Sequence, residues 1–301
     1  MDSIVQELKF VEPERLIPHF RSLGPSVAVT EGLFELDNPC RVEDMDWNHL
    51  DQLHRPAIHR TYQRSCRLAV GHSFAVSLTR LGRFGFWVVM TDVRLGPGLF
   101  YQMFSLFNLM YIHTIVHQEP LPGDRSRLRV QWFIVSHRLL RFLHPAIDRR
   151  LQRLNRIQNE EDMPIRERRA ALRKKGYRFG SNEPDFITSN LLTDQVLWPT
   201  WSGEEVIPLG GLKIGSATKT SAGAMEFLLR REIDGTVTVW PAVCPHEGGP
   251  LEQGVFCEEK IVCPWHELTQ HGVVLGSGVT EGRVGNCRIR LEKDLLRVTP
   301  L

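Results

Sequence analysis

Cys244-Pro245-His246 and Cys263-Pro264-Trp265-His266 are the two stretches of this 301-residue chain that decide how its last third folds. Sixteen residues separate them, and each stretch offers one thiol and one imidazole. Both residue types bind transition metals. The prolines would stiffen two loop tips, and Gly248 and Gly249 would let backbone N–H groups approach the sulfurs. The pattern therefore predicts two loops that face each other across one metal centre.

The order of the four ligands favours an iron–sulfur cluster over zinc. Zinc modules usually group two cysteines and then two histidines, whereas here each stretch carries one of each. In a [2Fe–2S] centre of mixed ligation, two thiolates hold one iron and two imidazoles hold the other. A Cys₂His₂ zinc site and four unrelated residues remain the alternatives.

Residues 203–301 resemble a Rieske domain on these motifs. The resemblance implies a [2Fe–2S] cluster bound by Cys244, His246, Cys263 and His266. Neither loop has the additional cysteine of respiratory Rieske proteins, which indicates the lower-potential ferredoxin or oxygenase type. Glu267-Leu268 departs from that type, which often has Gly-Trp after the last ligand.

Hydrophobicity patterns divide the chain into two domains, 1–198 and 199–301. The second is expected to be a small antiparallel β domain, because short apolar runs alternate with glycine and charged turns. In the first, five strand-like runs precede a helical pattern over residues 137–175. The expected strands are 68–78, 84–95, 99–107, 111–118 and 128–135.

An antiparallel sheet followed by a long helix predicts an α+β helix-grip fold, in which the sheet curls around the helix and leaves a cavity. Apolar residues of the helix, from Leu139 to Ile157, recur at spacings of three or four and predict one buried face. Pro145 and Pro164 are expected to kink or divide this helix.

A second metal centre is predicted near Asp51, His54 and His59. Asp51 and His54 are neighbours on a helical face, whereas His54 and His59 are five residues apart and diverge on a continuous helix. Pro56 disfavours helix at Arg55, so a bend could turn His59 back toward His54. Twelve histidines occur in the chain, so a chance pair on a surface helix is the alternative.

This segment resembles the mononuclear-iron motif of Rieske non-haem iron oxygenases. The resemblance implies that His54 and His59 bind iron with a downstream carboxylate, here Asp162, with Glu161 and Glu160 as substitutes. Asp51 would link the iron site to the cluster. Family members place the Rieske domain first, so the domain order here is permuted, and the resemblance implies a homotrimer.

Composition excludes few partners. The net charge of +2 does not call for nucleic acid. No secretory signal is recognisable, and the longest nearly uncharged stretch, residues 96–117, is too interrupted for a transmembrane segment. We therefore expect a cytoplasmic protein. Arginines are dense between Arg125 and Arg178, either as a solvated helix face or as a contact for an anionic partner or membrane surface.

The sequence predicts an oxygenase that uses O₂ and mononuclear Fe(II) to oxidise an apolar small molecule. Electrons would come from a separate ferredoxin and/or flavin reductase, because the chain has no Gly-x-Gly-x-x-Gly fingerprint. Acidic residues near the cluster loops, such as Glu247 and Glu252, could help to dock that partner. The alternative is a non-catalytic Rieske electron-transfer or redox-sensing protein fused to a lipid-binding module.

Overall fold

The computed structural model describes residues 18–20, 22, 24–51, 54–70, 74–81, 86–106, 108–180 and 196–301. These residues form two compact units, and α5 (His144–Lys174) passes from the first into the second at Arg168. The sequence placed a domain boundary at residue 199. The last turns of the helix belong to the second unit because they pack there, as shown below. Parts of three predicted strands, at 71–73, 84–85 and 107, lie outside the described residues.

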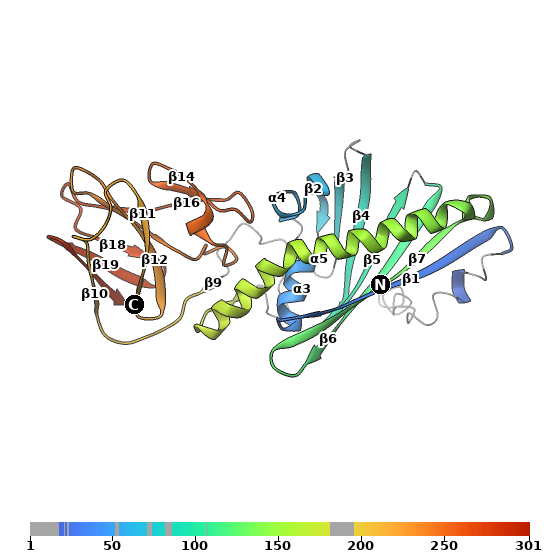
Figure 1. Ribbon diagram of the computed structural model, residues 1–301, viewed down its shortest axis with the longest axis horizontal. Coiled ribbons are helices and arrows are strands. Elements are labelled where there is room, and N and C mark those ends of the chain that lie inside the picture. The colour runs from blue at the N-terminus through green and yellow to red at the C-terminus, as the bar shows by residue number, and fades with distance from the viewer. Residues whose placement is uncertain are drawn as a thin grey trace, which may run out of the picture. The chain divides into compact units, whose positions relative to one another are not determined.

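The first unit is a seven-stranded antiparallel sheet in the order β1-β7-β6-β5-β4-β3-β2, with α5 running along one face (Figure 1). The predicted α+β architecture, a sheet around a long helix, is confirmed. The strands are β1 (Val27–Asn38), β2 (Tyr62–Val70), β3 (Phe74–Leu81), β4 (Phe86–Gly96), β5 (Leu99–Leu106), β6 (Met110–Leu121) and β7 (Arg125–His137).

Burial alternates from Arg125 to Val130 of β7, as expected for a strand whose successive side chains point to opposite faces. β1 pairs with β7 along its whole length, and Gly32 lies opposite Trp132. A Cβ at Gly32 would lie 2.3 Å from the Trp132 ring, so only glycine fits. The Trp132 indole is fully buried and donates a hydrogen bond to Asp148 of α5 at 2.9 Å, which ties the helix to the sheet.

The predictions for the long helix need two corrections. Residues Arg138–Leu143 form a separate 3₁₀ helix, η1, and Leu139 is 72% exposed instead of belonging to the buried face. Pro145 lies in the first turn of α5, where a missing N–H costs nothing. Pro164 lies inside α5, yet a single helix continues through it.

Two short helices precede the sheet's central strands. α3 (Val42–Leu50) ends before Asp51, and α4 (Arg55–Ile58) starts after a break. Pro56 occupies the first turn of α4. The expectation that Pro56 disfavours helix at Arg55 is wrong, because Arg55 is the first residue of α4; the chain is instead non-helical at Asp51 and His54 and leaves the helix again at His59.

The second unit is built of β-strands, as predicted, and its core lies between two four-stranded antiparallel sheets. A three-stranded sheet carries one of the cluster loops. Strands β8 and β9 pair with each other. The strands are β8 (Arg178–Phe179), β9 (Val196–Leu197), β10 (Glu205–Pro208), β11 (Ala217–Ala222), β12 (Met225–Arg231), β13 (Val237–Pro241), β14 (Val255–Cys257), β15 (Lys260–Val262), β16 (Thr269–His271), β17 (Val273–Leu275), β18 (Glu281–Val284), β19 (Cys287–Glu292) and β20 (Leu295–Pro300), with a 3₁₀ turn, η4, at Leu251–Gln253.

Candidate metal centres

Two loops of the second unit, 244–249 and 263–268, share one backbone pattern. The N–H of Cys244 donates to the carbonyl of Gly249, and the N–H of Gly248 donates to the carbonyl of Cys244. The second loop repeats both bonds between Cys263 and residues 268 and 267. All four bonds are 2.9 Å long. Each loop is therefore closed within six residues and presents a cysteine and a histidine from a fixed frame.

The fourth residue after each cysteine adopts the left-handed conformation that this loop requires. Gly248 has φ +89° and Glu267 has φ +57°. Glycine adopts such angles without strain, whereas other residues adopt them at a cost in conformational free energy. The departure from Gly-Trp that the sequence showed at Glu267-Leu268 therefore leaves the loop geometry intact, at some cost in stability.

The four predicted cluster ligands face each other in like pairs. The Nδ1 atoms of His246 and His266 are 3.1 Å apart, and the thiols of Cys244 and Cys263 are buried and close enough to perturb each other. The Cys244 side chain lowers the pKa of Cys263 to about 7, and burial opposes this effect. Backbone N–H groups of residues 246–247 and 265–266 also favour the two thiolates.

This donor set fits a [2Fe–2S] cluster. Two neighbouring thiolates suit one iron, two neighbouring imidazoles suit the other, and backbone N–H groups are ready for sulfur. Gly249 completes the cradle, since a Cβ there would lie 2.6 Å from the Cys263 sulfur.

The end of α5 holds the first cluster loop through two arginines. Arg168 donates to the Gly248 carbonyl at 2.7 Å. Arg169 is fully buried and pairs with the equally buried Glu247 at 2.6 Å, while its guanidinium stacks 3.8 Å from the centre of the Phe179 ring. Glu247 is therefore unavailable for the partner docking that the sequence suggested, because its charge is used inside the unit.

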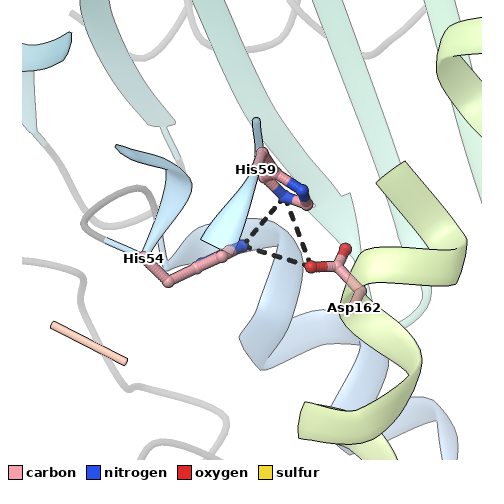
Figure 2. Close-up of side chains that lie close together, drawn as sticks. All are labelled: His54, His59 and Asp162. Atoms are coloured by element: carbon pink, nitrogen blue, oxygen red, sulfur yellow. Dashed lines mark hydrogen bonds and ion pairs between the residues drawn. The ribbon is translucent and has the colours of Figure 1, made fainter. Parts of the chain in front are cut away.

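In the first unit, His54, His59 and Asp162 converge on one point (Figure 2). The histidines come from the two ends of α4, and Asp162 comes from α5. His59 makes this arrangement possible because it has already left the helix (φ −91°, ψ 115°), whereas two histidines five residues apart point in different directions on an unbroken helix. All three side chains are buried.

The distances within this trio suit one metal ion. The two histidine Nε2 atoms are 3.3 Å apart, and Asp162 Oδ1 lies 3.4 Å from His54 Nε2 and 3.3 Å from His59 Nε2. Metal–ligand bonds of about 2.1 Å would place three such atoms on one face of an ion, about 100° apart. The residues present therefore fit a facial triad of two histidines and one carboxylate.

Two further carboxylates orient the histidines. Asp51 Oδ2 lies 3.4 Å from His54 Nδ1, and Glu161 Oε2 lies 3.1 Å from His59 Nδ1. A carboxylate at Nδ1 keeps the proton there, so that Nε2 presents its lone pair to a metal. Glu161, named from sequence as a substitute ligand, thus contacts the outer nitrogen of a histidine instead, and Glu160 is exposed.

Burial and charge act in opposite directions on the trio. Burial by itself lowers the pKa of His54, but Asp162 and Asp51 outweigh it and raise that pKa to about 9. Burial prevails at His59 and lowers its pKa. Burial would raise the pKa of Asp162, but Arg166 and the two histidines outweigh it and keep the pKa low. Asp162 is therefore a carboxylate, as a metal ligand must be.

Arg166 is the residue that makes a buried Asp162 carboxylate possible. Its Nη2 donates to Asp162 Oδ2 at 2.9 Å, on the side away from the histidines. The other N–H groups of this guanidinium donate to buried amide oxygens, so all five of its donors have acceptors. These acceptors are Asn48 Oδ1 (3.0 Å from Nε and 2.7 Å from Nη2), Asn38 Oδ1 (3.1 Å) and Asn159 Oδ1 (2.8 Å).

The trio lies in the wall of a cavity of about 600 Å³ between the sheet and α5. Most of the lining comes from apolar side chains of β5, β6, β7 and α5, including Phe104, Ile112, Val130 and Leu154. Many polar side chains also reach the cavity, among them Arg55 and Gln102. Arg55 and Gln102 both donate to the buried carboxylate of Asp92, at 3.3 and 2.6 Å. Such a cavity suits an apolar small molecule.

Sequence reasoning missed Arg166 and Arg169, which it left among the residues of a solvated face. They are buried, at 1% and 0% exposure. They follow Asp162 by four and seven residues and therefore share its helix face. A charged residue on an otherwise inward face was the available signal.

Comparisons with known proteins separate the two units. Residues 205–276 match the model of the Rieske [2Fe–2S] domain. No curated protein matches the chain.

Solved structures resembling the chain at 12–15% identity have TM-scores of 0.35–0.38. The Zhui aromatase/cyclase from Streptomyces sp. R1128 (15% identity, TM-score 0.37) and a START superfamily protein from Mycobacterium smegmatis (12%, 0.38) each cover 46% of this chain and 97% of their own. Norcoclaurine synthase from Thalictrum flavum (12%, 0.35) covers 40% of this chain and 78% of its own. Residues 205–276, which include Cys244, His246, Cys263 and His266, are a Rieske [2Fe–2S] domain, and this implies iron–sulfur electron transfer.

Proposed function

We propose that the chain is the oxygenase component of a Rieske non-haem iron system and oxidises an apolar small molecule with O₂. The observation that carries the proposal is the buried trio of His54, His59 and Asp162 in the wall of an apolar cavity. A Rieske domain by itself only transfers electrons. A second metal centre beside a substrate-sized cavity would be the acceptor of the electron that the cluster passes on.

The chain's residues divide the work. His54, His59 and Asp162 hold a ferrous ion, and Asp51 and Glu161 keep the histidine Nε2 atoms turned toward it. Arg166 occupies the second oxygen of Asp162, so this carboxylate offers the metal a single atom, Oδ1. When bound, iron with three protein ligands on one face supplies open positions for O₂ beside the substrate.

The cavity and the cluster loops supply the remaining functions. Apolar side chains of β5–β7 and α5 exclude water and bind the body of the substrate. Cys244, His246, Cys263 and His266 hold the cluster, which accepts single electrons from a ferredoxin and/or flavin reductase. Asp51 is proposed as the link between the cluster and the iron, in the homotrimer that the family resemblance implies.

The test compares His54→Ala with His117→Ala, an exposed histidine outside the trio, in protein loaded anaerobically with Fe(II). We expect His54→Ala to lose one iron per chain and to lose the EPR signal that nitric oxide gives with mononuclear ferrous iron. The reduced cluster's EPR signal should persist in both variants. Equal iron content and equal nitrosyl signals in both variants would instead support an electron carrier fused to a binding module.

A further inference from the structure

Three segments meet at one end of the seven-stranded sheet. Met110 at the start of β6 pairs with Ser136 near the end of β7, and Val27 at the start of β1 pairs with His137. The tip of the β5–β6 hairpin and η1 therefore lie at the same end, and α5 begins there (Figure 1). We call this region the apolar end: residues 108–111 and 138–143.

Large apolar side chains are exposed at this end. Phe142 is 75% exposed, Leu139 72% and Leu109 62%, while Tyr111 and Leu143 are 40% and 38% exposed. Single exposed apolar residues are common, but several on two adjoining segments mark an interaction surface. η1 is a short turn, so Leu139 and Phe142 are held close together.

The charge at the apolar end has one sign. Residues 24–30, 104–114 and 136–147 contain no aspartate or glutamate. Arg138 and Arg141 flank the apolar side chains of η1, and four arginines follow on the first turns of α5, where the one acidic residue, Asp148, accepts a hydrogen bond from Trp132. All six are exposed, and in the described parts of the chain none forms an ion pair; the four on α5 are Arg149, Arg150, Arg153 and Arg156.

The opposite end of the sheet is different. Arg125 and Arg127, at the start of β7, both pair with Asp37, and Arg41 pairs with Asp124. Arginines there are compensated, so excess positive charge is a property of the apolar end and not of the sheet as a whole.

The cavity reaches toward the apolar end. Ala146 and Arg150 line the cavity and are also exposed, and Leu106 and Ile112 line it from the adjoining hairpin. Asp162 is sixteen residues further along α5, about 24 Å from Ala146 at the rise of an α-helix. The cavity thus extends from the metal trio to the surface where the apolar end lies.

We propose that the apolar end docks on the surface of an anionic lipid bilayer. Leu139, Phe142 and Leu109 enter the boundary between headgroups and acyl chains, and the arginines contact lipid phosphates. Arginines that flank a protruding apolar turn suit a bilayer, where the stem is buried and the guanidinium stays at the headgroups. A molecule dissolved in the bilayer would then enter the cavity without crossing water.

Vesicle sedimentation of the cluster-loaded full chain tests this proposal. We expect binding to vesicles of mixed phosphatidylglycerol and phosphatidylcholine, weaker binding to phosphatidylcholine alone, and weakening by salt. Arg138→Gln/Arg141→Gln should lower affinity about 30-fold, at about fivefold for each arginine near a charged surface. Leu139→Ser/Phe142→Ser should lower it about tenfold or more.

Matched controls lie elsewhere in the chain. Arg125→Gln/Arg127→Gln removes two arginines from the opposite end of the sheet, and Ile233→Ser removes a 90% exposed apolar side chain from the second unit. Neither should change vesicle binding. Equal binding by wild type and the apolar-end variants would overturn the proposal, as would no binding to anionic vesicles together with capture of an acidic protein or self-association through this end. Iron content should be the same in all variants, so docking is tested independently of the oxygenase proposal.

Discussion

Cys244 and Cys263 each begin a loop whose backbone closes within six residues, whereas His54 and His59 meet an aspartate about 100 residues further along the chain. The cluster loops owe their shape to local backbone hydrogen bonds. The trio instead depends on the packing of α4 against α5 and on a buried charge network. Local closure makes the first centre recognisable from sequence, and long-range packing makes the second sensitive to residues that touch no metal.

The two centres also differ in how they stabilise their anionic ligands. Backbone N–H groups point at the cysteine sulfurs, and substituting a side chain does not remove these donors. Asp162 depends on one side chain, Arg166, for the hydrogen bond to its second oxygen. Substitutions outside the ligand set should therefore affect the trio far more than the cluster.

The largest expected effect is loss of a cluster ligand. Cys263→Ala removes one of two thiolates on an iron, so the [2Fe–2S] cluster and its visible absorption should be lost completely. Because the trio lies in the other unit, mononuclear iron should remain, and iron per chain should fall to one. Visible spectroscopy and elemental analysis measure both quantities. Retention of the cluster would contradict the ligand assignment.

Arg166→Met should be nearly as severe for the first unit. It leaves the Asp162 charge and three amide oxygens buried without their donor, which should lower the free energy of unfolding by about 3–5 kcal/mol. Urea unfolding provides the measurement, with exposed Arg156→Met as the control. The milder Arg166→Lys keeps the positive charge but loses the planar array of five N–H donors. It should weaken Fe(II) binding about 10- to 100-fold in folded protein. Unchanged metal affinity in Arg166→Lys would exclude the role given to this arginine.

Glu161→Ala should have a smaller effect on the same centre. Removing the carboxylate beside His59 Nδ1 should weaken metal binding about tenfold by loosening the imidazole's orientation. Glu160→Ala, the exposed neighbour on the same helix, serves as the control. Competition with a chelator gives both dissociation constants, and a tenfold loss in the Glu160 variant but not in the Glu161 variant would reverse the two assignments.

The smallest effect is expected at Glu267. Glycine would adopt the left-handed conformation of this residue without strain, so Glu267→Gly should raise the stability of the second unit by about 0.5–1 kcal/mol. Gly248→Ala at the equivalent position should destabilise it, since a Cβ there would also lie 2.9 Å from the Phe179 ring. Thermal unfolding of the cluster-loaded protein compares the two. Destabilisation by Glu267→Gly would mean that the Glu267 side chain makes a needed contact.

The difference between local loop closure and long-range packing also explains which site residues could be predicted from the sequence. The Rieske domain could be predicted because each loop places a cysteine and a histidine within four residues, and the assignment of these four residues as ligands stays a prediction. Asp162 was preferred to Glu161 on the family resemblance, and helical spacing could not decide between them, because Asp162 follows the cavity-lining Gln158 by four residues while Glu161 follows Ile157 by four. Both positions continue a plausible inward face, and only the packing of α5 on the sheet sets the rotation of the helix.

Other errors have similar physical causes. β1 was overlooked because Glu31, Glu35 and Asp37 interrupt its apolar pattern, yet it pairs with β7 along its whole length. The exposed Leu139 was assigned to a buried face because its spacing fits a helix that in fact begins at His144.

Among the described residues, no helix is long and apolar enough to cross a bilayer.

The ratio of iron to acid-labile sulfide tests the central claim most directly. A [2Fe–2S] cluster contributes two irons and two sulfides, and the trio adds an iron without sulfide. Wild-type protein loaded anaerobically with Fe(II) should give three irons for two sulfides, and Asp162→Ala should give two for two while Glu160→Ala retains three. Equal iron and sulfide in the wild type, unchanged by Asp162→Ala, would contradict a second metal centre.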